Sequence, residues 1–447
     1  MIVKRLSAVV NQVLSDYGMI LVLIGLCAFF SVTTYSEQYP NGADGARRLA
    51  TRVKAAAGEG VVLVVVRDTP EDQEFAQTLL ESLGASGLKV EAVRGAPADA
   101  RRALNRLGES GQALAAIACN QVTASWSVYE PAQARYPSLA KARIYRPESY
   151  SWPNFLKADN LLNIANQIAV IAIIAIGMTL VIITGGIDLS VGSLIALAAV
   201  VTARLIRDAA GAEAATTTGM VLAGAAGVAV GAGSGIFSGL MVTLFRIPPF
   251  IVTLAVMLVA SGAAYILADG QSIHQVPDRF IWLGRGSDLA WLPNAVVLML
   301  LLYAFAHLLM TRTVTGRHIY AVGGNAEAAR LSGVPVRRVL VLVYSFCGAL
   351  AGLGGVVMAS QLKSGAPTYG QMYELYVIAA VVVGGTSLSG GQGRVLGTLI
   401  GAFIIAVIQN GMNLRGVESY TQKIVLGSVI LAAVLLDRLR RGGGSRV

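Results

Sequence analysis

Two glycine-containing segments hold the polar residues with the clearest chemical meaning in this sequence. The first, residues 184–193, reads Thr-Gly-Gly-Ile-Asp-Leu-Ser-Val-Gly-Ser and includes Gly185, Gly186, Asp188 and Ser190. Two adjacent glycines end a helix, and Asp188 or Ser190 is suited to cap the helix that follows. A carboxylate at the edge of an apolar run is costly unless it is capped, paired or hydrated. The segment therefore predicts a helix break with Asp188 as N-cap, an element of a transport path, or both.

The second segment, residues 384–394, reads Gly-Gly-Thr-Ser-Leu-Ser-Gly-Gly-Gln-Gly-Arg and repeats the pattern Gly-Gly-x-x-Leu-Ser-x-Gly. The repeat begins at Gly384 and Gly385 and predicts a second broken helix whose free backbone groups line a cavity, although so short a repeat also arises by chance. Residues 388–392 spell the signature motif of ABC ATPases. None of the seven Lys follows a Gly, however, so the phosphate-binding G-x-x-x-x-G-K loop is absent. We therefore expect no ATP hydrolysis by this chain alone.

Polar side chains also recur within the apolar runs. Amides in such runs usually bond between helices, and they can also bond a hydroxylated solute. The three His and three Cys are scattered, so we predict no metal site and no catalytic residue. The polar set comprises Asn163, Asn166, Gln167, Thr179, Ser261, Gln409, Asn410 and Asn413. Those assigned to the transport path, together with the glycine segments, are Asn166, Gln167, Gln409 and Asn410.

A loop at 311–338 contains a short helix-forming stretch. Asn325 is a good N-cap, the following Ala-Glu-Ala-Ala-Arg-Leu favours a helix, and Gly333 suits the position after its end. The pattern predicts a capped helix in the longest cytoplasmic loop. It is either a solvated connector or a docking element for a cytoplasmic partner.

The elements that position these residues follow from composition. Of 447 residues, 55% are hydrophobic and 13% charged, about half the charged share of soluble proteins. Residues 34–160 hold 29 of the 60 charged residues. The net charge of +10 lies mostly in short loops between apolar runs, and for this reason a nucleic-acid partner is not predicted. We predict an all-α polytopic membrane protein with about ten transmembrane helices and a small α/β extracytoplasmic insertion. The expected spans are 18–35, 161–184, 189–206, 218–243, 248–267, 292–311, 339–360, 374–388, 395–412 and 421–437, of which 374–388 is short and broken.

The insertion, residues 36–160, changes the sequence pattern. Runs at 61–66, 89–93 and 113–118 predict strands, and the stretches between them predict helices, which together suggest a parallel sheet over about 60–118. No glycine-rich turn follows the first strand, so nucleotide binding is not supported. Residues 128–160, rich in Pro, Tyr and Arg, are expected to be a linker back to the membrane.

The N-terminus and the loop charges give an orientation. Residues 2–17 have apolar residues at a helical period and precede the first span, and together they form the N-terminal segment 1–35. No small-x-small cleavage site follows the span, so an uncleaved membrane anchor is favoured over a signal peptide. With the N-terminus inside, 13 basic residues lie in inner segments against seven in the outer loops, the insertion excluded. We therefore expect both termini to be cytoplasmic, with a basic tail at 438–447, a transmembrane domain at 161–437 and residues 36–160 outside the cytoplasm.

These strings resemble a known family. Residues 160–167, Asn-Leu-Leu-Asn-Ile-Ala-Asn-Gln, the run 174–193, the loop 322–334 and the run 382–393 are similar to the permease subunits of bacterial ABC importers of the ribose/xylose/autoinducer-2 group. The likeness covers about 150–440 and the first span. It implies about ten helices in the bacterial inner membrane and a monosaccharide-type solute.

The resemblance also implies partners. It suggests three protein partners: a cytoplasmic ABC ATPase, which binds the ATP, a periplasmic solute-binding protein, and a second permease subunit. The second permease subunit is either a copy of this chain or a different chain. This chain is expected to lie in the lipid bilayer and to bind no cofactor of its own. ATP-driven closure of the ATPases would push on loop 322–334 and reorient the spans. The residues that it assigns to this coupling loop are Gly323, Gly324, Asn325, Glu327, Ala328, Ala329, Arg330 and Gly333.

The insertion departs from the family pattern, which has a short connection at this place, and it puts ordinary docking of a binding protein in doubt. Its strand order loosely resembles part of a binding-protein lobe, but it is too small to enclose a sugar alone. The alternatives are a permease for branched-chain amino acids or another small polar solute, a stand-alone secondary transporter, and a membrane sensor. Only about ten residues follow the last span, which disfavours the sensor.

Overall fold

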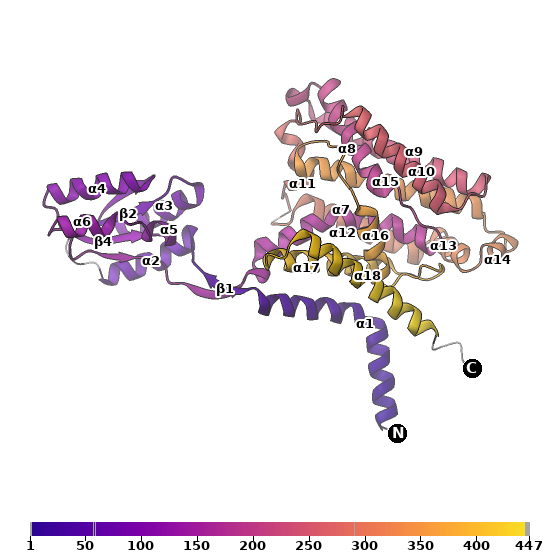
Figure 1. Cartoon of the computed structure of the whole chain (residues 1–447), viewed down its shortest axis with the longest axis horizontal. Coiled ribbons are helices and arrows are strands. Elements are labelled where there is room, and N and C mark those ends of the chain that lie inside the picture. The colour runs from indigo at the N-terminus through magenta and orange to yellow at the C-terminus, as the bar shows by residue number, and fades with distance from the viewer. Residues whose placement is uncertain (1, 57, 59, 290, 443–447) are drawn as a thin grey trace. The chain divides into compact units, whose positions relative to one another are not determined.

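The computed structural model divides the chain into two units, which are described separately (Figure 1). It describes residues 2–56, 58, 60–289 and 291–442, with backbone only for 2–17, 433 and 436–442. A helical unit comprises the described residues up to Thr34 and from Asn154 onward, and an α/β unit comprises Tyr35–Pro153. The last five residues of the predicted basic tail lie outside the described residues.

The helical unit consists of long helices joined by short helical turns. Its elements are α1 (Ile2–Thr33), η1 (Asn154–Leu156), α7 (Ala158–Ile183), α8 (Val191–Asp208), η2 (Ala212–Ala214), α9 (Thr217–Leu244), α10 (Pro249–Leu267), η3 (Asp278–Ile281), α11 (Trp282–Arg285), α12 (Asn294–Arg312), α13 (Val314–Gly324), α14 (Ala326–Leu331), α15 (Val336–Leu362), α16 (Tyr373–Val383), α17 (Val395–Leu414) and α18 (Ser419–Gly442).

Most of these helices are long and apolar, as a polytopic membrane protein requires. Among the described residues, six helices are long and apolar enough to cross a membrane: α7, α9, α10, α12, α15 and α17. The apolar part of α1 and the 11-residue α16 are shorter. The predicted shortness of 374–388 is confirmed, since α16 ends at Val383. The other two predicted spans are also helices, although α8 carries Arg204, Arg207 and Asp208 near its end and α18 is only partly described.

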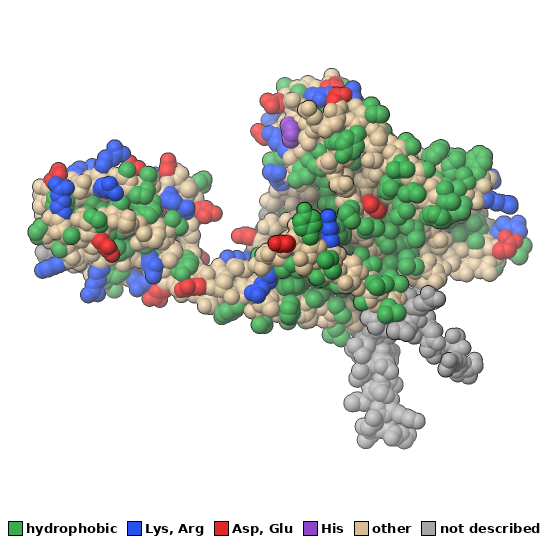
Figure 2. All heavy atoms as spheres, viewed as in Figure 1, with side chains coloured by type: hydrophobic (Ala, Val, Ile, Leu, Met, Phe, Trp, Pro, Cys, Tyr) green, Lys and Arg blue, Asp and Glu red, His purple; other side chains and the backbone are tan. Residues whose placement is uncertain are grey.

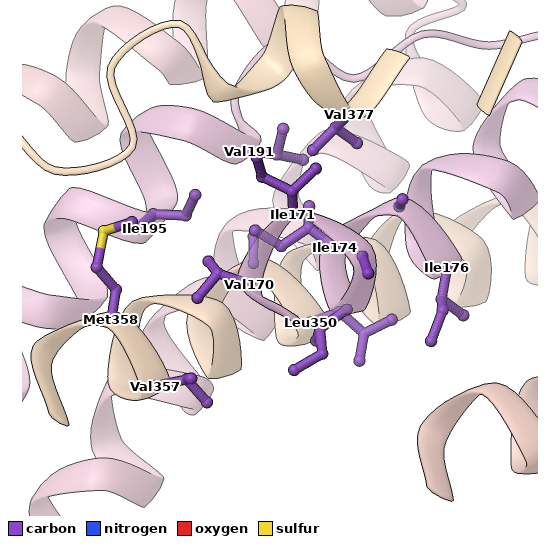
Figure 3. Packing of buried hydrophobic residues seen from close by; sticks show 14 of the residues in the cluster. Val170, Ile171, Ile174, Ile176, Val191, Ile195, Leu350, Val357, Met358 and Val377 are labelled. Atoms are coloured by element: carbon purple, nitrogen blue, oxygen red, sulfur yellow. The ribbon is translucent and has the colours of Figure 1, made fainter. Parts of the chain in front are cut away.

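The core of the helical unit forms around α7, whose second half is buried on all sides. Branched side chains of α7, α8, α15 and α16 interdigitate there, and Figure 3 shows Val170, Ile174, Ile195, Leu350 and Val377 among them. Figure 2 shows hydrophobic side chains covering much of the outer surface of this unit, whereas charged side chains are spread over the α/β unit. Such an apolar exterior fits contact with lipid.

Glycines bring α9 and α15 into backbone contact. A Cβ atom added to Gly231 would lie 2.3 Å from the Gly348 carbonyl oxygen, and one added to Gly235 would lie 2.2 Å from the Tyr344 carbonyl oxygen. Small residues four apart on one helix face permit this approach. The Gly- and Ala-rich run at 223–235 therefore serves helix packing.

The α/β unit contains a four-stranded parallel sheet of order β3-β2-β4-β5 and a two-stranded antiparallel ribbon of β1 and β6. Helices cover both faces of the sheet: α2 and α3 pack on one side, and α4 and α6 on the other. The elements are β1 (Tyr35–Gln38), α2 (Gly42–Ala56), β2 (Val61–Val66), α3 (Pro70–Gly84), β3 (Lys89–Arg94), α4 (Pro97–Glu109), β4 (Leu114–Cys119), α5 (Gln121–Ala124), α6 (Tyr129–Arg135), β5 (Arg143–Tyr145) and β6 (Tyr150–Pro153).

The prediction of a linker at 128–160 is wrong. Tyr129 in α6 is almost fully buried against the sheet, and β5 pairs with β4 as a fourth parallel strand. The α/β unit also extends beyond 60–118 on the N-terminal side, because α2 buries Leu49 and Val53. The prolines of 128–160 are compatible with these elements, since Pro131 stands in the first turn of α6, Pro153 ends β6, and the others lie between elements.

Candidate transport path and coupling surface

The predicted capped helix within 311–338 is confirmed as α14. The Asn325 side-chain oxygen accepts a hydrogen bond from the Ala328 amide at 2.9 Å. Gly333 ends the helix with φ +84°; its amide bonds the Arg330 carbonyl, and the Val334 amide bonds the Ala329 carbonyl. Figure 1 shows α13 and α14 together at one end of the helical unit.

One face of α14 packs and the other is free. Ala329 is buried in the core, whereas Ala328 and Leu331 are exposed, the latter to 76%. Glu327 and Arg330 form an exposed ion pair one turn apart, and the hydrogen bond from Arg330 lowers the pKa of Glu327. The free face therefore combines an apolar tip with a pair of charges.

The first glycine segment ends α7 and turns back into the protein. Gly185 has φ +80°, which suits a glycine, and Asp188 is fully buried. The Asp188 carboxylate accepts hydrogen bonds from the Ser190 amide at 2.9 Å and the Ser190 hydroxyl at 2.6 Å. Its other oxygen accepts no bond of ordinary geometry from the described residues, although the Cys347 thiol lies beside the carboxylate.

The prediction that Asp188 or Ser190 caps α8 with its side chain is wrong. Ser190 stands at the N-cap position, but its side chain makes no capping hydrogen bond. The reason is that α8 begins at Val191, so Asp188 lies two residues before the N-cap, and the hydroxyl of Ser190, at the N-cap, donates to Asp188. The two residues stabilise the turn before α8.

The second glycine segment ends α16 by the same turn, but not in the register of the sequence repeat. The amide of Gly185 bonds the Ile182 carbonyl, and that of Gly385 bonds the Val382 carbonyl; both glycines have positive φ. The sequence repeat aligns Gly185 with Gly384. The structural equivalence is therefore shifted by one residue, which shows that the helix end and not the repeated letters determines the turn.

The two glycine segments meet α13 at one junction, formed by Ile183, Gly185, Tyr320, Gly323 and residues 390–393. The Gly391 amide donates to the Ile183 carbonyl at 2.8 Å, and the Tyr320 hydroxyl donates to the Gly393 carbonyl at 2.7 Å. A Cβ added to Gly323 would lie 1.7 Å from the Ile183 oxygen. The helix before α14 is thus in contact with the end of α7 and with the loop that joins α16 to α17.

Two of the four predicted path amides are engaged in structural bonds. Asn410 and Asn160 exchange hydrogen bonds of 2.8 and 3.0 Å, which join α17 to α7. Asn166 donates to the Gly284 carbonyl at 3.2 Å. These contacts indicate helix packing for Asn166 and Asn410.

The other two predicted path amides, Gln167 and Gln409, line a cavity of about 260 Å³ between α7, α15, α16 and α17. Gln361 and Tyr373 complete its polar lining, and Ile, Leu, Met and Ala side chains form the rest. Gln361 bonds the Asn166 carbonyl at 2.9 Å, which fixes its amide. A pocket with a few placed amides in an apolar wall is suited to a small hydroxylated solute.

Sequence reasoning missed Gln361 and Tyr373. Gln361 is an amide near the end of a span and carries the same signal as Gln167, whereas nothing local distinguishes Tyr373. The cavity lies away from the glycine junction, because Gln167 precedes Ile183 by 16 residues of α7, about 24 Å along a helix. A second cavity of about 200 Å³ includes Ser261 and Glu374. Among the described residues, no His, Cys, Asp or Glu group has the arrangement of a metal site.

Comparison with known proteins identifies relatives of this chain. Residues 160–434 match the family model described as branched-chain amino acid transport system / permease component. The chain is 45% identical to the ribose import permease protein RbsC of Escherichia coli (strain K12) over 293 residues, which cover 65% of this chain and 88% of the relative.

Two further relatives are also named as sugar transport permeases. The ribose import permease protein RbsC of Bacillus subtilis (strain 168) is 46% identical over 288 residues, 64% of this chain and 87% of the relative. The D-allose transport system permease protein AlsC of Escherichia coli (strain K12) is 36% identical over 285 residues, 64% and 85% respectively. No solved structure matches the chain.

Proposed function

The chain belongs to the branched-chain amino acid transport system / permease component family, and on this premise we propose that it forms the transport path of an ABC importer for a monosaccharide. It is a multi-pass membrane protein and a transporter subunit, not an enzyme. The observation that carries the proposal is the identity of 45% along 88% of a ribose import permease. Relatives named for ribose and allose favour a sugar over the amino acids in the family description.

The cavity between α7, α15, α16 and α17 supports a hydroxylated solute. Gln167 and Gln409 each offer an N–H donor group and a C=O acceptor, as sugar hydroxyls require, and Gln361, whose amide nitrogen donates to Asn166, offers its C=O acceptor. No charged side chain lines this cavity, whereas a zwitterionic amino acid would need charged partners or helix termini. The cavity is therefore assigned to the sugar.

The glycine junction supports a route from a partner to the path. An ABC permease works with an ATPase and a solute-binding protein, and we assign the exposed face of α14 to the ATPase. Movement of α14 shifts α13, and Gly323 transmits the shift to the end of α7 and to the loop at 390–393, which precedes α17, because the backbones touch. Packed interiors transmit such shifts since they have little free volume. The spans then reorient between outward and inward access.

The orientation follows the charge distribution. The excess of basic residues in the loops supports ten crossings, both termini in the cytoplasm and the α/β unit outside it. In this arrangement the cavity opens toward the outer side, near the end of α15 and the beginning of α7. A second permease subunit completes the importer. The chain itself binds no cofactor, and ATP is bound by the ATPase.

The first test is uptake. Proteoliposomes containing the chain, its co-purifying ATPase and the binding protein should take up labelled D-ribose or another monosaccharide when ATP is supplied. Labelled leucine measures the alternative. ATP-driven uptake of leucine with none of any monosaccharide would contradict the proposal, as would sugar uptake that needs no ATPase.

Neighbouring amides provide a test of the cavity. Gln409→Leu should raise the KM for the sugar about tenfold, since it removes hydrogen bonds worth about 1–1.5 kcal/mol, while ATPase binding is unchanged. Asn410→Ala is the matched control. It should lower the free energy of unfolding by about 1–3 kcal/mol, because Asn160 loses its partner, and leave KM unchanged. An unaltered KM in Gln409→Leu would remove this residue from the path.

The coupling surface has its own test. Glu327→Arg reverses one charge of the exposed pair on α14, and Gly333→Pro disrupts the turn that ends it. Both should reduce co-purification of the ATPase and ATP-driven uptake, while the chain still inserts and binds detergent normally. ATPase binding and uptake equal to those of the parent chain in both variants would exclude α14 as the contact.

A further inference from the structure

The segment that joins α15 to α16, residues 363–372, packs along α8 and brings the beginnings of two helices together. A Cβ added to Gly365 would clash with the Ala199 carbonyl oxygen. Farther along the segment, a Cβ added to Gly370 would clash with the Gly192 carbonyl oxygen. Ala199 and Gly192 are about 10 Å apart along α8. The segment therefore follows α8 back to its first turn, and α16 begins there.

The first turn of α16 carries a carboxyl group to a position within the membrane. An α16 of 11 residues is about 16 Å long, against a hydrocarbon thickness of about 30 Å, so its two ends cannot both lie at membrane surfaces. Glu374 belongs to its first turn, and the carboxylate fills the space that a Cβ on Gly192 would occupy. An ionisable group at such a depth is costly and marks a functional site.

Glu374 has no cationic partner among the described residues. Its carboxylate accepts a hydrogen bond only from its own backbone amide there. The side chain is partly buried and lines the second cavity, of about 200 Å³, which lies between α8, α10 and residues 367–374. This cavity, here called the Glu374 cavity, gives the carboxylate an open side on which a solute can reach it.

The other polar side chains of the Glu374 cavity can both donate and accept hydrogen bonds. All of them retain accessible surface, and among the described residues none uses its side chain in a hydrogen bond. They come from the first turn of α8, from α10 and from the segment before α16: Ser193, Ser261, Tyr265, Thr368 and Gln371.

This set of groups is suited to a neutral polyol. Sugar hydroxyls donate and accept at once, as the lining hydroxyls do, and two of them can donate to one carboxylate. An anion would be repelled by Glu374, since no Lys or Arg lines the cavity among the described residues. A cation would need acceptors alone, whereas most of this lining also donates.

The two cavities of the helical unit adjoin the same turn of α16. Tyr373 lines the cavity that contains Gln167 and Gln409, here called the Gln167 cavity. Its neighbours in sequence, Met372 and Glu374, line the Glu374 cavity instead. The first turn of α16 therefore stands between the two cavities.

We propose that the Glu374 cavity is a second monosaccharide site, which exchanges solute with the Gln167 cavity past the first turn of α16. The sugar class rests on the proposed function. Thr368 and Gln371 are exposed, so the cavity is open on their side and part of a bound sugar remains uncovered. The affinity is therefore millimolar, which allows the solute to leave again.

Methionines report on the two cavities separately. Met257 and Met372 line the Glu374 cavity, and Met358 lines the Gln167 cavity. The full chain in nanodiscs is labelled with ¹³C-methyl methionine, and single replacements of these residues by Leu identify their signals. D-ribose should shift all three signals in a saturable way. D-ribose 5-phosphate and ethanolamine, an anion and a cation, should leave the Met257 signal in place.

Two variants distinguish the sites. Glu374→Gln replaces a charged acceptor by a neutral amide and should weaken the sugar-dependent shift of Met257 at least about fivefold. The shift of Met358 should be retained in this variant. Gln409→Leu should have the reverse effect, because Gln409 lines only the Gln167 cavity.

A second variant and a control protect this test against a loss of folding. Ser261→Ala removes one hydroxyl from α10 and should weaken the Met257 shift about threefold. Since Ala favours a helix more than Ser does, this variant keeps the fold even where Glu374→Gln does not. Glu213→Gln is the matched control, because this exposed carboxylate lies in η2, outside both cavities, and it should behave as the parent chain.

The outcomes separate the two proposals. The second site would be overturned by any of three results: no shift of Met257 and Met372 with any monosaccharide, a shift with the phosphate ester or ethanolamine alone, or equal Met257 shifts in Glu374→Gln and Glu213→Gln. Sugar uptake in proteoliposomes would then still support the importer. Absence of all sugar uptake, with leucine transported, would overturn the proposed function instead.

Discussion

The two units of this chain achieve close packing by different means. In the helical unit, glycines bring backbones together: Gly231 and Gly235 on α9 contact α15, and Gly323 contacts the end of α7. In the α/β unit, branched side chains fill the space between the sheet and its helices, as Val64 and Leu79 do. The first kind of contact leaves no room for a methyl group, whereas the second depends on side-chain volume.

The use of charge differs in the same way. The ion pairs of the described helical unit join side chains at its surface, and its buried carboxylate, Asp188, is bonded by Ser190; in the α/β unit the buried carboxylate, Asp72, is paired with Arg67. Backbone contacts suit the proposed movement of helices as rigid bodies, since a flat glycine face has no interlocking side chains to release. A buried carboxylate that is paired with a guanidinium suits a unit that keeps one conformation.

The junction gives the largest expected effect. In Gly323→Ala the added methyl group meets the Ile183 carbonyl at 1.7 Å, so the backbone of α13 or α7 must shift. Overpacking costs about 1–3 kcal/mol, and a contact with backbone is at or beyond the upper end of this range. ATP-driven uptake should fall at least about tenfold, measured in proteoliposomes with the ATPase present.

The adjacent glycine is the control for that variant. Gly324 has no atom within 4 Å of an added Cβ and does not have positive φ, so Gly324→Ala should transport as the parent chain does. Equal uptake by Gly323→Ala and Gly324→Ala would show that the junction tolerates displacement. The conclusion that backbone contacts leave no room for a methyl group would then be wrong at Gly323.

A smaller effect is expected in the seam between α9 and α15. Gly231→Ala places a methyl group 2.3 Å from the Gly348 oxygen, whereas Gly233→Ala meets nothing within 4 Å. The first should lower the free energy of unfolding by about 1–3 kcal/mol, and the second should raise it by up to about 1 kcal/mol through helix propensity. Thermal unfolding in detergent, followed by circular dichroism, measures both. A stable Gly231→Ala would indicate that the two helices separate at little cost.

Local patterns predicted much of this architecture. The runs of apolar residues correspond to helices, and the β-branched run Val61–Val66 is the central strand β2. The caps of α14 were predicted, because Asn325 and Gly333 act through bonds to residues three or four positions away. Where a signal is contained within one turn, the sequence suffices.

The misses concern contacts that depend on other elements. Asp188 is a suitable cap by type, but α8 begins at Val191, so the N-cap position belongs to Ser190 and Asp188 lies two residues before it. Tyr373 joins the cavity only because α16 packs beside α7 and α17, which no local pattern encodes. The strand β5 is three residues long and has too little periodicity to be recognised.

The smallest expected effect is the pH dependence of the α/β unit. Burial alone would raise the pKa of Asp72, but hydrogen bonds from the Arg67 side chain and backbone, and from Asn120, together lower it below its ordinary value. The unfolded carboxyl has a pKa of about 3.9, so the folded state binds the proton less readily. The stability from this group is therefore complete above the unfolded pKa and is lost as the pH falls through the folded pKa.

Acid titration of the fluorine signal of 5-fluorotryptophan at Trp126, which is partly buried in the α/β unit, measures this loss. We expect a contribution of about 1–2 kcal/mol, below the usual value for a bond to a buried charge, because Arg67 keeps over a third of its side chain in water. Asp72→Asn should remove this part of the pH dependence, whereas Asp44→Asn, which alters an exposed carboxylate on α2, should retain it. If Asp72→Asn and the parent chain lose stability in parallel with falling pH, the buried pair does not fix the edge of the sheet, and the contrast between the two units rests on packing alone.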